Sequence, residues 1–328
     1  MKHGGNVWQG GHPSHWLDFS ANLRPEGMPE WVKSAISRAS ENVRYYPDPD
    51  MGLAASGLAA YAGVSDDMIL PAAGGIAAID LALSQNPGRV ITDRHTFGEY
   101  ALRASVQGRE CVTWDGSQLR EGDTRVICNP NNPTGTAMSR EEILNTYKSL
   151  KNSGCDLIAD EAFIDYCPDV SVRRDAQEGL SIVGSLTKIL CIPGVRLGYV
   201  CAGKEAISCL KRKAMPWALN AFAARIAAEL PEHLEEIRRD ASLNEYRRDL
   251  FCSLLEDMGA QVQPSNANFL LCDFGRDMSD AVWYLKTRNI LVRECASFGL
   301  GANYLRLAVR TEEENRLLTE ELKKWLAS

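Results

Sequence analysis

One lysine stands beside two hydroxyl side chains in the segment Ser185-Leu186-Thr187-Lys188, and Arg196 follows in a Pro-Gly-Val-Arg-Leu-Gly-Tyr run. A lysine amine can hold the carbonyl carbon of an aldehyde cofactor as a Schiff base. The cofactor's phosphate then needs a cradle, which a hydroxyl and a planar guanidinium can supply. We therefore predict that Lys188 attaches such a cofactor and that Ser185 and Arg196 hold its phosphate. The alternative is a solvated lysine after a strand.

Three further polar motifs are expected where buried strands end. They are Asn-Pro-Asn-Asn-Pro-Thr-Gly at 129–135, Asp-Glu-Ala-Phe at 160–163, and Gly74-Gly75 before a helix that starts near Ile76. Ligands bind at the carboxyl edge of an open α/β sheet, and a helix N-terminus offers backbone N–H groups to a phosphate. The convergence of these motifs is more specific than any one of them, and it predicts a cofactor site at that edge.

Short apolar runs alternate with helical patterns between residues 68 and 202. The expected strands are Val90–Thr92, Val126–Cys128, Leu157–Ala159, Ile182–Gly184 and Tyr199–Cys201. Ser139 and Glu142 have the spacing of a capping box, which predicts a helix from there towards Lys151. This order predicts an α/β fold with a mostly parallel sheet covered by helices.

The pattern changes after residue 214. We expect a long helical stretch from Leu219 to Met258 that is interrupted at Pro231, and a final helix from Thr311. Expected strands lie at Phe269–Cys272, Ile290–Arg293 and Tyr304–Val309. We predict three units: an N-terminal segment (1–40) that packs with the small domain, a large domain (41–213) and a small C-terminal α+β domain (214–328).

The composition excludes several classes of protein. The chain has 328 residues, a net charge of -7 and no basic run, so nucleic-acid binding is not expected. Its ten cysteines lack Cys-x-x-Cys spacing, which indicates free thiols in a reducing cytoplasm and no metal site. No apolar run approaches 18 residues, so no membrane span or secretion signal is expected.

These motifs resemble those of the fold type I pyridoxal-phosphate (PLP) enzymes, in the aminotransferase class that includes histidinol-phosphate aminotransferase. The resemblance extends over nearly the whole chain. It implies that Lys188 is the Schiff-base lysine and that Asp160 pairs with the cofactor's pyridine nitrogen. It gives the other cofactor contacts to Asn132, Ser185, Arg196, Gly74, Gly75, the Ile76 backbone, Phe97 and Tyr46. Tyr46 resembles a tyrosine that reaches the neighbouring subunit's cofactor, which implies a homodimer with shared active sites.

Within this class the chain is similar to the threonine-phosphate decarboxylases of cobalamin biosynthesis. The similarity lies in His-Gly-Gly-Asn at 3–6, Asp-Phe-Ser-Ala-Asn at 18–22, Asp-Glu-Ala-Phe-Ile-Asp at 160–165, and the segments 290–295 and 304–310. It implies substrate contacts at His3, Gly4, Asn22, Asn132, Arg293 and Arg306. The chemistry of Arg293 and Arg306 agrees with such a substrate, because a phosphate and a carboxylate together need several cations. Surface salt bridges are the alternative for either arginine.

The resemblance implies decarboxylation of O-phospho-L-threonine, with Lys188 returning a proton to the α-carbon. An aminotransferase of the histidinol-phosphate type and a decarboxylase of O-phospho-L-serine stay open, and a PLP-binding protein without activity is a further alternative. Two residues depart from the family's pattern. Ile76 stands where relatives often have a hydroxyl residue, and Arg24 replaces an asparagine near the substrate loop. Arg24 is either a surface arginine or an additional cation of the site.

Overall fold

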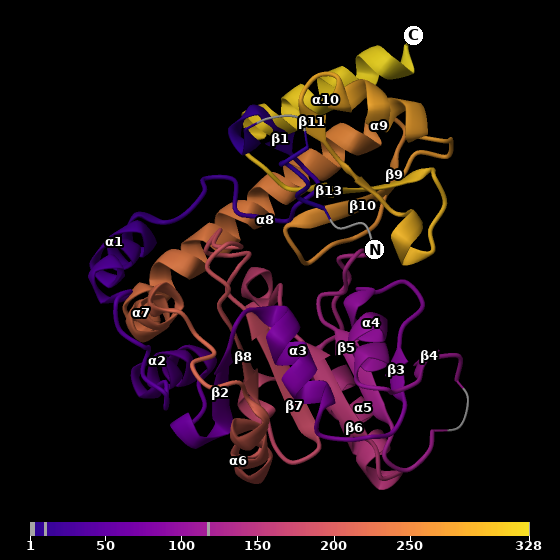
Figure 1. Ribbon diagram of the computed structural model, residues 1–328. Coiled ribbons are helices and arrows are strands. Elements are labelled where there is room, and N and C mark those ends of the chain that lie inside the picture. The colour runs from indigo at the N-terminus through magenta and orange to yellow at the C-terminus, as the bar shows by residue number, and fades with distance from the viewer. Residues whose placement is uncertain (1–3, 10–11, 117–118, 328) are drawn as a thin grey trace.

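A seven-stranded sheet forms the larger part of the protein in the computed structural model, which describes residues 4–9, 12–116 and 119–327 (Figure 1). β8 runs antiparallel to both of its neighbours, and all other neighbouring strands are parallel. In sheet order the strands are β2 (Ile69–Ala72), β8 (Gly198–Cys201), β7 (Leu180–Ser185), β6 (Asp156–Asp160), β5 (Thr124–Cys128), β3 (Val90–Thr92) and β4 (Cys111–Thr113).

The five strands predicted for this region are all present. Every residue of β5, β7 and β8 is buried, as expected for strands with both faces covered. Helices flank the sheet, with α3 packed on β7 and β8 and α5 on β6 (Figure 1). The helices of this part are α2 (Gly52–Ala62), α3 (Gly75–Leu83), α4 (Glu99–Val106), α5 (Arg140–Asn152) and α6 (Lys204–Lys213).

Two capping boxes fix helix starts that the sequence predicts. The Ser139 hydroxyl accepts the N–H of Glu142 at 3.2 Å, and the Glu142 carboxylate accepts the N–H of Ser139 at 2.7 Å, so α5 begins at Arg140. Thr311 and Glu314 make the same reciprocal pair before α10 (Glu312–Leu326). Both predicted starts are confirmed.

A four-stranded antiparallel sheet forms the core of the smaller part. Its order is β12 (Arg293–Glu294), β13 (Tyr304–Ala308), β10 (Phe269–Asp273) and β9 (Gln261–Val262), and α9 (Ser279–Lys286) and α10 pack near it. The prediction of one strand at Ile290–Arg293 is wrong. β11 (Ile290–Leu291) pairs with β1 (Leu17–Asp18) in a separate sheet, and β12 pairs with β13. The chain changes sheet at Val292.

The predicted interruption of the long helical stretch is confirmed. α7 (Ala221–Glu229) ends before a 3-10 turn that contains Pro231, and α8 (Leu234–Glu256) follows. Proline cannot donate the backbone bond that would continue α7. The 3-10 helices are η1 (Pro13–His15), η2 (Ser40–Asn42), η3 (Asp66–Met68), η4 (Ile164–Tyr166), η5 (Pro168–Val170), η6 (Arg173–Asp175), η7 (Leu230–His233) and η8 (Ala296–Phe298).

The N-terminal segment packs on two different parts of the chain. β1 pairs in parallel with β11, and the ring of Phe19 is buried in the core of the smaller part. α1 (Glu30–Ala39) packs instead on α7, whose apolar side chains belong to the larger core. The division of the chain at residues 40 and 213 stays a prediction. Within the described ranges, no helix has the length and apolar character needed to cross a membrane.

Candidate active site

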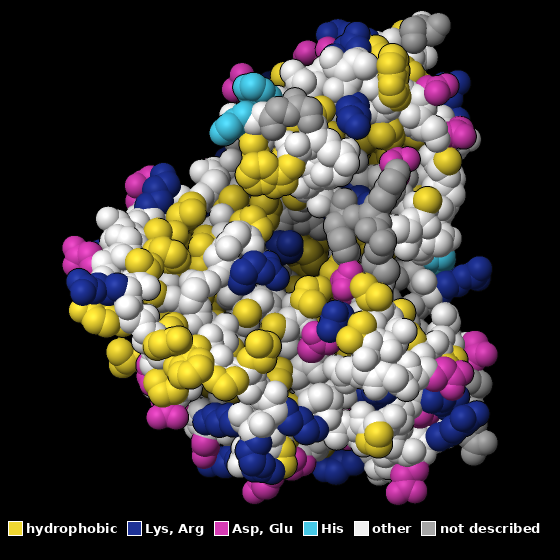
Figure 2. Space-filling model, in the orientation of Figure 1, with side chains coloured by type: hydrophobic (Ala, Val, Ile, Leu, Met, Phe, Trp, Pro, Cys, Tyr) yellow, Lys and Arg dark blue, Asp and Glu magenta, His cyan; other side chains and the backbone are white. Residues whose placement is uncertain are grey.

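A cavity of about 500 Å³ lies between the central sheet and the smaller antiparallel sheet. Cys128, Asp160 and Ser185, the last residues of β5, β6 and β7, line one side of it, and Arg293 and Arg306 line another. The surface is hollowed between these two parts of the molecule (Figure 2). The cavity therefore lies at the strand edge where the sequence motifs predict a site.

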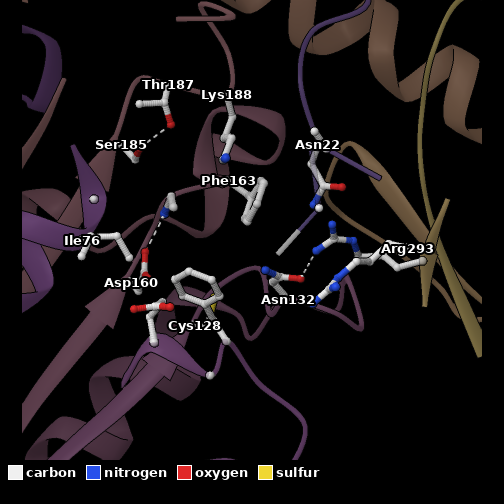
Figure 3. A pocket seen from close by; sticks show the side chains of 18 of the residues that line it. Asn22, Ile76, Cys128, Asn132, Asp160, Phe163, Ser185, Thr187, Lys188 and Arg293 are labelled. Carbon is white, nitrogen blue, oxygen red and sulfur yellow. Dashed lines mark hydrogen bonds between the residues drawn. The ribbon is translucent and has the colours of Figure 1, made fainter. Parts of the chain in front are cut away.

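The amine of Lys188 points into this cavity from the loop after β7 (Figure 3). Burial lowers the pKa of Lys188 to about 8, and repulsion from Arg306 and Arg196 acts in the same direction. A substantial fraction of the amine is therefore neutral near physiological pH. A neutral amine is what attack on an aldehyde requires.

Asp160 is buried at the end of β6 and holds two hydrogen bonds. Its Oδ2 accepts the hydroxyl of Tyr100 at 2.6 Å, and its Oδ1 accepts the N–H of Ala162 at 3.0 Å. Burial raises the pKa of Asp160, while these two bonds and the Lys188 charge lower it. Within the part of the chain that is described, no cationic side chain lies within ion-pair distance of this carboxylate. The position suits a cationic N–H of a ligand.

The residues that the sequence predicts to hold a phosphate lie together around the start of α3. The side chains of Ser185 and Arg196 line the cavity with Gly75 and Ile76. Gly74 has a φ of +85°, and a Cβ there would lie 2.6 Å from Nη2 of Arg196, so glycine leaves the space that the guanidinium occupies. Thr187 adds a hydroxyl 2.9 Å from that of Ser185. The first N–H groups of α3 have no carbonyl partner within the helix.

Phe97 and Asn132, for which the sequence predicts cofactor contacts, also line the cavity. The ring of Phe97 meets that of Tyr100 edge to face, with the centroids 5.7 Å apart. Asn132 Oδ1 accepts the Nη1–H of Arg306 at 2.6 Å. The side chain of Phe163 faces the same space and contacts Phe269 edge to face.

Arg306 is buried among polar and aromatic groups. Its Nη2 donates to the carbonyl of Ser20 at 2.7 Å, and its Nε has no partner. Burial and, to a smaller extent, the charge of Arg293 lower the pKa of Arg306 to about 10. No carboxylate of the described residues lies within ion-pair distance of Arg306. A surface salt bridge is therefore excluded for this residue, and an anionic ligand would supply the missing charge.

Gly4 and Asn22 bring the N-terminal segment into the cavity wall. A Cβ at Gly4 would lie 2.0 Å from the carbonyl oxygen of Ser20, which only glycine avoids. The buried Oδ1 of Asn22 has no hydrogen-bond partner and so offers an acceptor to a ligand. His3, a predicted substrate contact, lies outside the described residues.

Tyr46 and Arg24, which the sequence analysis connects with the site, do not line the cavity. Tyr46 is 82% exposed, and its ring packs 4.8 Å from that of Trp217 outside the cavity of its own chain. Arg24 does not line the cavity either. Its Nη2 donates to Asp240 Oδ1 of α8 at 3.1 Å, and its backbone N–H donates to the Lys188 carbonyl at 3.4 Å. Arg24 is thus neither a surface arginine nor an additional cation of the cavity.

Sequence reasoning missed Tyr100, Ser20, Ser297 and Phe298. Tyr100 stands in the His-Thr-Phe-Gly-Glu-Tyr run three residues after Phe97, so helical spacing could have suggested that both face one site. Ser297 and Phe298 lie on η8 and line the cavity. Nothing in their local pattern distinguishes them, because the fold of the smaller part brings them there.

The family model for aminotransferase class I and II matches residues 14–322. Threonine-phosphate decarboxylase of Salmonella typhimurium is 32% identical to this chain, over 98% of the chain and 95% of the relative. Histidinol-phosphate aminotransferase of Granulibacter bethesdensis is 30% identical, over 95% of the chain and 90% of the relative. The two activities are thus represented at similar identity.

Solved structures give the same picture of the fold. L-threonine-O-3-phosphate decarboxylase from Porphyromonas gingivalis superimposes with a TM-score of 0.86 at 25% identity, covering 94% of this chain and 99% of its own. Histidinol-phosphate aminotransferase from Sinorhizobium meliloti, solved in complex with pyridoxal-5'-phosphate, has a TM-score of 0.82 at 19% identity. It covers 93% of this chain and 90% of its own.

Proposed function

Because the chain belongs to the aminotransferase class I and II family, we propose that it decarboxylates O-phospho-L-threonine. The products are (R)-1-amino-2-propanol O-2-phosphate and carbon dioxide, and the reaction serves cobalamin (vitamin B12) biosynthesis. The chain is a fold type I enzyme of the PLP-dependent class, and its cofactor is pyridoxal 5'-phosphate. The observation that carries the proposal is the buried pair Arg293 and Arg306 beside the amine of Lys188.

The residues of the cavity fit this cofactor. Asp160 offers a buried carboxylate to the pyridine nitrogen, and Asn132 offers an amide to the ring oxygen. Ser185, Arg196 and the start of α3 offer hydroxyl, guanidinium and N–H donors to the phosphate. When bound, pyridoxal phosphate supplies an electron sink for cleavage of a bond at the α-carbon of an amino acid.

The substrate has two anionic groups, and the cavity has two arginines to receive them. Arg306 and Arg293 are partners across β12 and β13, so the two guanidinium groups face one binding region. Asn22 adds an acceptor without a partner, and the Ser20 carbonyl fixes Arg306. Holding a remote phosphate gives binding energy that can select which bond at the α-carbon is aligned for cleavage.

Lys188 is the group that moves a proton. The pKa of its Nζ, near 8, lets it give and take a proton at physiological pH, and the amine faces the cavity in which the substrate's α-carbon would lie. After carbon dioxide leaves, Lys188 Nζ returns a proton to that carbon. Phe163, Phe97 and Phe298 line the cavity with apolar surface, which limits the access of water.

An aminotransferase of the histidinol-phosphate type is the second candidate. It is favoured by the 30% identity to the Granulibacter bethesdensis enzyme. A decarboxylase that prefers O-phospho-L-serine is a variant of the first. The test is to incubate the PLP-loaded protein with each phosphoamino acid, with and without 2-oxoglutarate. Aminopropanol phosphate and carbon dioxide without the keto acid support the proposal, and glutamate formed only with the keto acid would overturn it.

We also propose that the enzyme is a cytoplasmic homodimer that shares its active sites. Hydrophobic side chains gather on the face over α2 (Figure 2), and Tyr46, Leu53 and Met215 are each about four-fifths exposed. The ring of Trp217 packs against that of Tyr46 at an interplanar angle of 35°. Asn220, three residues further along the chain, donates its amide N–H to the carbonyl of Val195 beside Arg196. A partner subunit there would cover the apolar face. Light scattering should give twice the chain mass, and a lower mass for Tyr46→Ser would support this interface.

A further inference from the structure

His95 connects the larger part of the molecule to a loop of the smaller part at the edge of the cavity. It lies between β3 and α4, two residues before Phe97. Its Nδ1 lies 2.7 Å from the carbonyl oxygen of Phe298, a residue 203 positions away. A carbonyl oxygen only accepts, so Nδ1 carries the proton of this bond. This hydrogen bond therefore joins the segment between β3 and α4 to η8 of the smaller part.

The backbone of His95 is itself held in place. The Nδ2–H of Asn131 donates to the carbonyl of His95 at 2.9 Å, and Asn131 Oδ1 accepts the hydroxyl of Thr96 at 2.8 Å. Asn131 directly precedes Asn132, which accepts a bond from Arg306. The loop of His95 and the Asn-Pro-Thr-Gly motif thus form one polar unit beside the cavity.

The loop that His95 holds carries two residues of the cavity wall. Ser297 Oγ accepts the Nη2–H of Arg293 at 2.6 Å. The ring of Phe298 lies 5.2 Å from the guanidinium carbon of Arg293 and 5.8 Å from that of Arg306. Gly299 follows with a φ of +75°, and a Cβ there would lie 3.6 Å from Nδ1 of His95. A shift of this loop would change the surroundings of both arginines.

We propose that His95 is a positioning residue, which holds the loop of Ser297 and Phe298 in place around Arg293 and Arg306. Through this bond the larger part of the molecule sets the shape of the anion-binding side of the cavity. His95 does not line the cavity and acts on the substrate only through the loop. The identity of the anion rests on the proposed function, whereas the contact of His95 with the loop does not.

Two replacements separate the hydrogen bond from the volume of the ring. His95→Leu removes the N–H donor, and His95→Gln keeps one. His15→Leu is the control at an exposed histidine outside the cavity. Loss of this partly buried bond should raise the KM for O-phospho-L-threonine about tenfold in His95→Leu, with kcat and cofactor absorbance nearly unchanged. In His95→Gln the KM should lie close to that of the native protein. Amide hydrogen exchange at residues 296–299 should be faster only in His95→Leu.

A KM in His95→Leu equal to that of the native protein would overturn the inference, and so would a parallel loss of kcat and cofactor absorbance. If the native protein does not decarboxylate phosphothreonine, the proposed function fails. The positioning role of His95 is then tested by the thermal protection that inorganic phosphate gives to the native protein and to His95→Leu. Phosphate that protects the native protein against heat, but protects His95→Leu much less, supports the inference. Equal protection together with unchanged amide exchange overturns it.

Discussion

Arg293 and Arg306 face each other directly across β12 and β13, and both are buried. Like charges in opposite positions of neighbouring strands destabilise a sheet, and burial increases the effect. Hydrogen bonds to Asn132 and Ser20 orient Arg306, and neither of these groups carries a negative charge. The hydroxyl of Ser297 accepts a hydrogen bond from Arg293. No carboxylate of the described residues lies within ion-pair distance of Arg306, and its Nε has no partner, so Arg306 is best explained as a residue whose charge an anionic ligand balances.

Arg306→Ala should weaken binding of O-phospho-L-threonine by about 100-fold, because a charge-assisted contact is lost and an amide acceptor is left without its donor. The affinity for pyridoxal phosphate should change less than threefold. Both can be measured by titration followed through cofactor absorbance. Arg316→Ala, at an exposed position of α10, is the control. Equal loss of both affinities would place Arg306 outside the substrate site.

Tyr100→Phe should weaken cofactor binding. The Tyr100 hydroxyl lowers the pKa of Asp160, so its removal raises that pKa and favours the neutral acid, which cannot pair with a protonated ring nitrogen. Loss of a hydrogen bond to a buried charged group costs about 1.5–3 kcal/mol, or roughly 10–100-fold in affinity. Equilibrium dialysis of cofactor measures the effect. Tyr147→Phe removes a hydroxyl bonded to the Glu178 carbonyl away from the cavity and should leave the affinity unchanged.

Cofactor attachment should depend on pH through Lys188. The pKa of Lys188 is lowered to about 8 in the cofactor-free protein, so the neutral amine increases as the pH rises through that value. The rate of attachment should increase about tenfold from pH 7 to pH 9. Stopped-flow absorbance at limiting cofactor measures this rate. Pyridoxine phosphate, which lacks the aldehyde, should bind without such a rise. A flat profile for pyridoxal phosphate would contradict the assigned pKa.

Arg24→Ala should lower the free energy of unfolding and leave the preference between phosphothreonine and phosphoserine unchanged. Arg24 and Asp240 are both mostly buried, with Nε and Oδ2 3.1 Å apart, so loss of the pair should cost about 1–2 kcal/mol, between exposed and fully buried pairs. Urea unfolding measures this cost. The double exchange Arg24→Asp with Asp240→Arg should restore part of it. A changed preference between phosphothreonine and phosphoserine in Arg24→Ala would show that Arg24 acts on the substrate after all.

Five strands of the central sheet and two helix starts were predicted from the sequence, because buried apolar runs and capping boxes are local signals, whereas β2 and β4 were not predicted. Val90–Thr92 and the start of α5 at Arg140 follow directly from the apolar run and from Ser139 with Glu142. The same holds for Lys188, Asp160 and Asn132, since each stands next to a predicted strand end. Their joint presence in one cavity follows from the shared edge of the sheet.

The remaining features depend on contacts between distant segments. The separation of β11 from β12 at Val292 arises because β1 pairs with β11, and no local pattern near residue 290 indicates it. Arg24 has an ordinary sequence context, and only the course of α8 shows that Asp240 is its partner. For the same reason the bond from His95 to Phe298 could not be predicted.

The most direct test of the central claim follows the carboxyl carbon. O-phospho-L-threonine labelled at its carboxyl group is incubated with the PLP-loaded protein in the absence of any keto acid. We expect labelled carbon dioxide and aminopropanol phosphate in equal amounts, and neither product with Lys188→Ala. Labelled carboxylate retained in a keto acid, or normal turnover by Lys188→Ala, would contradict the account.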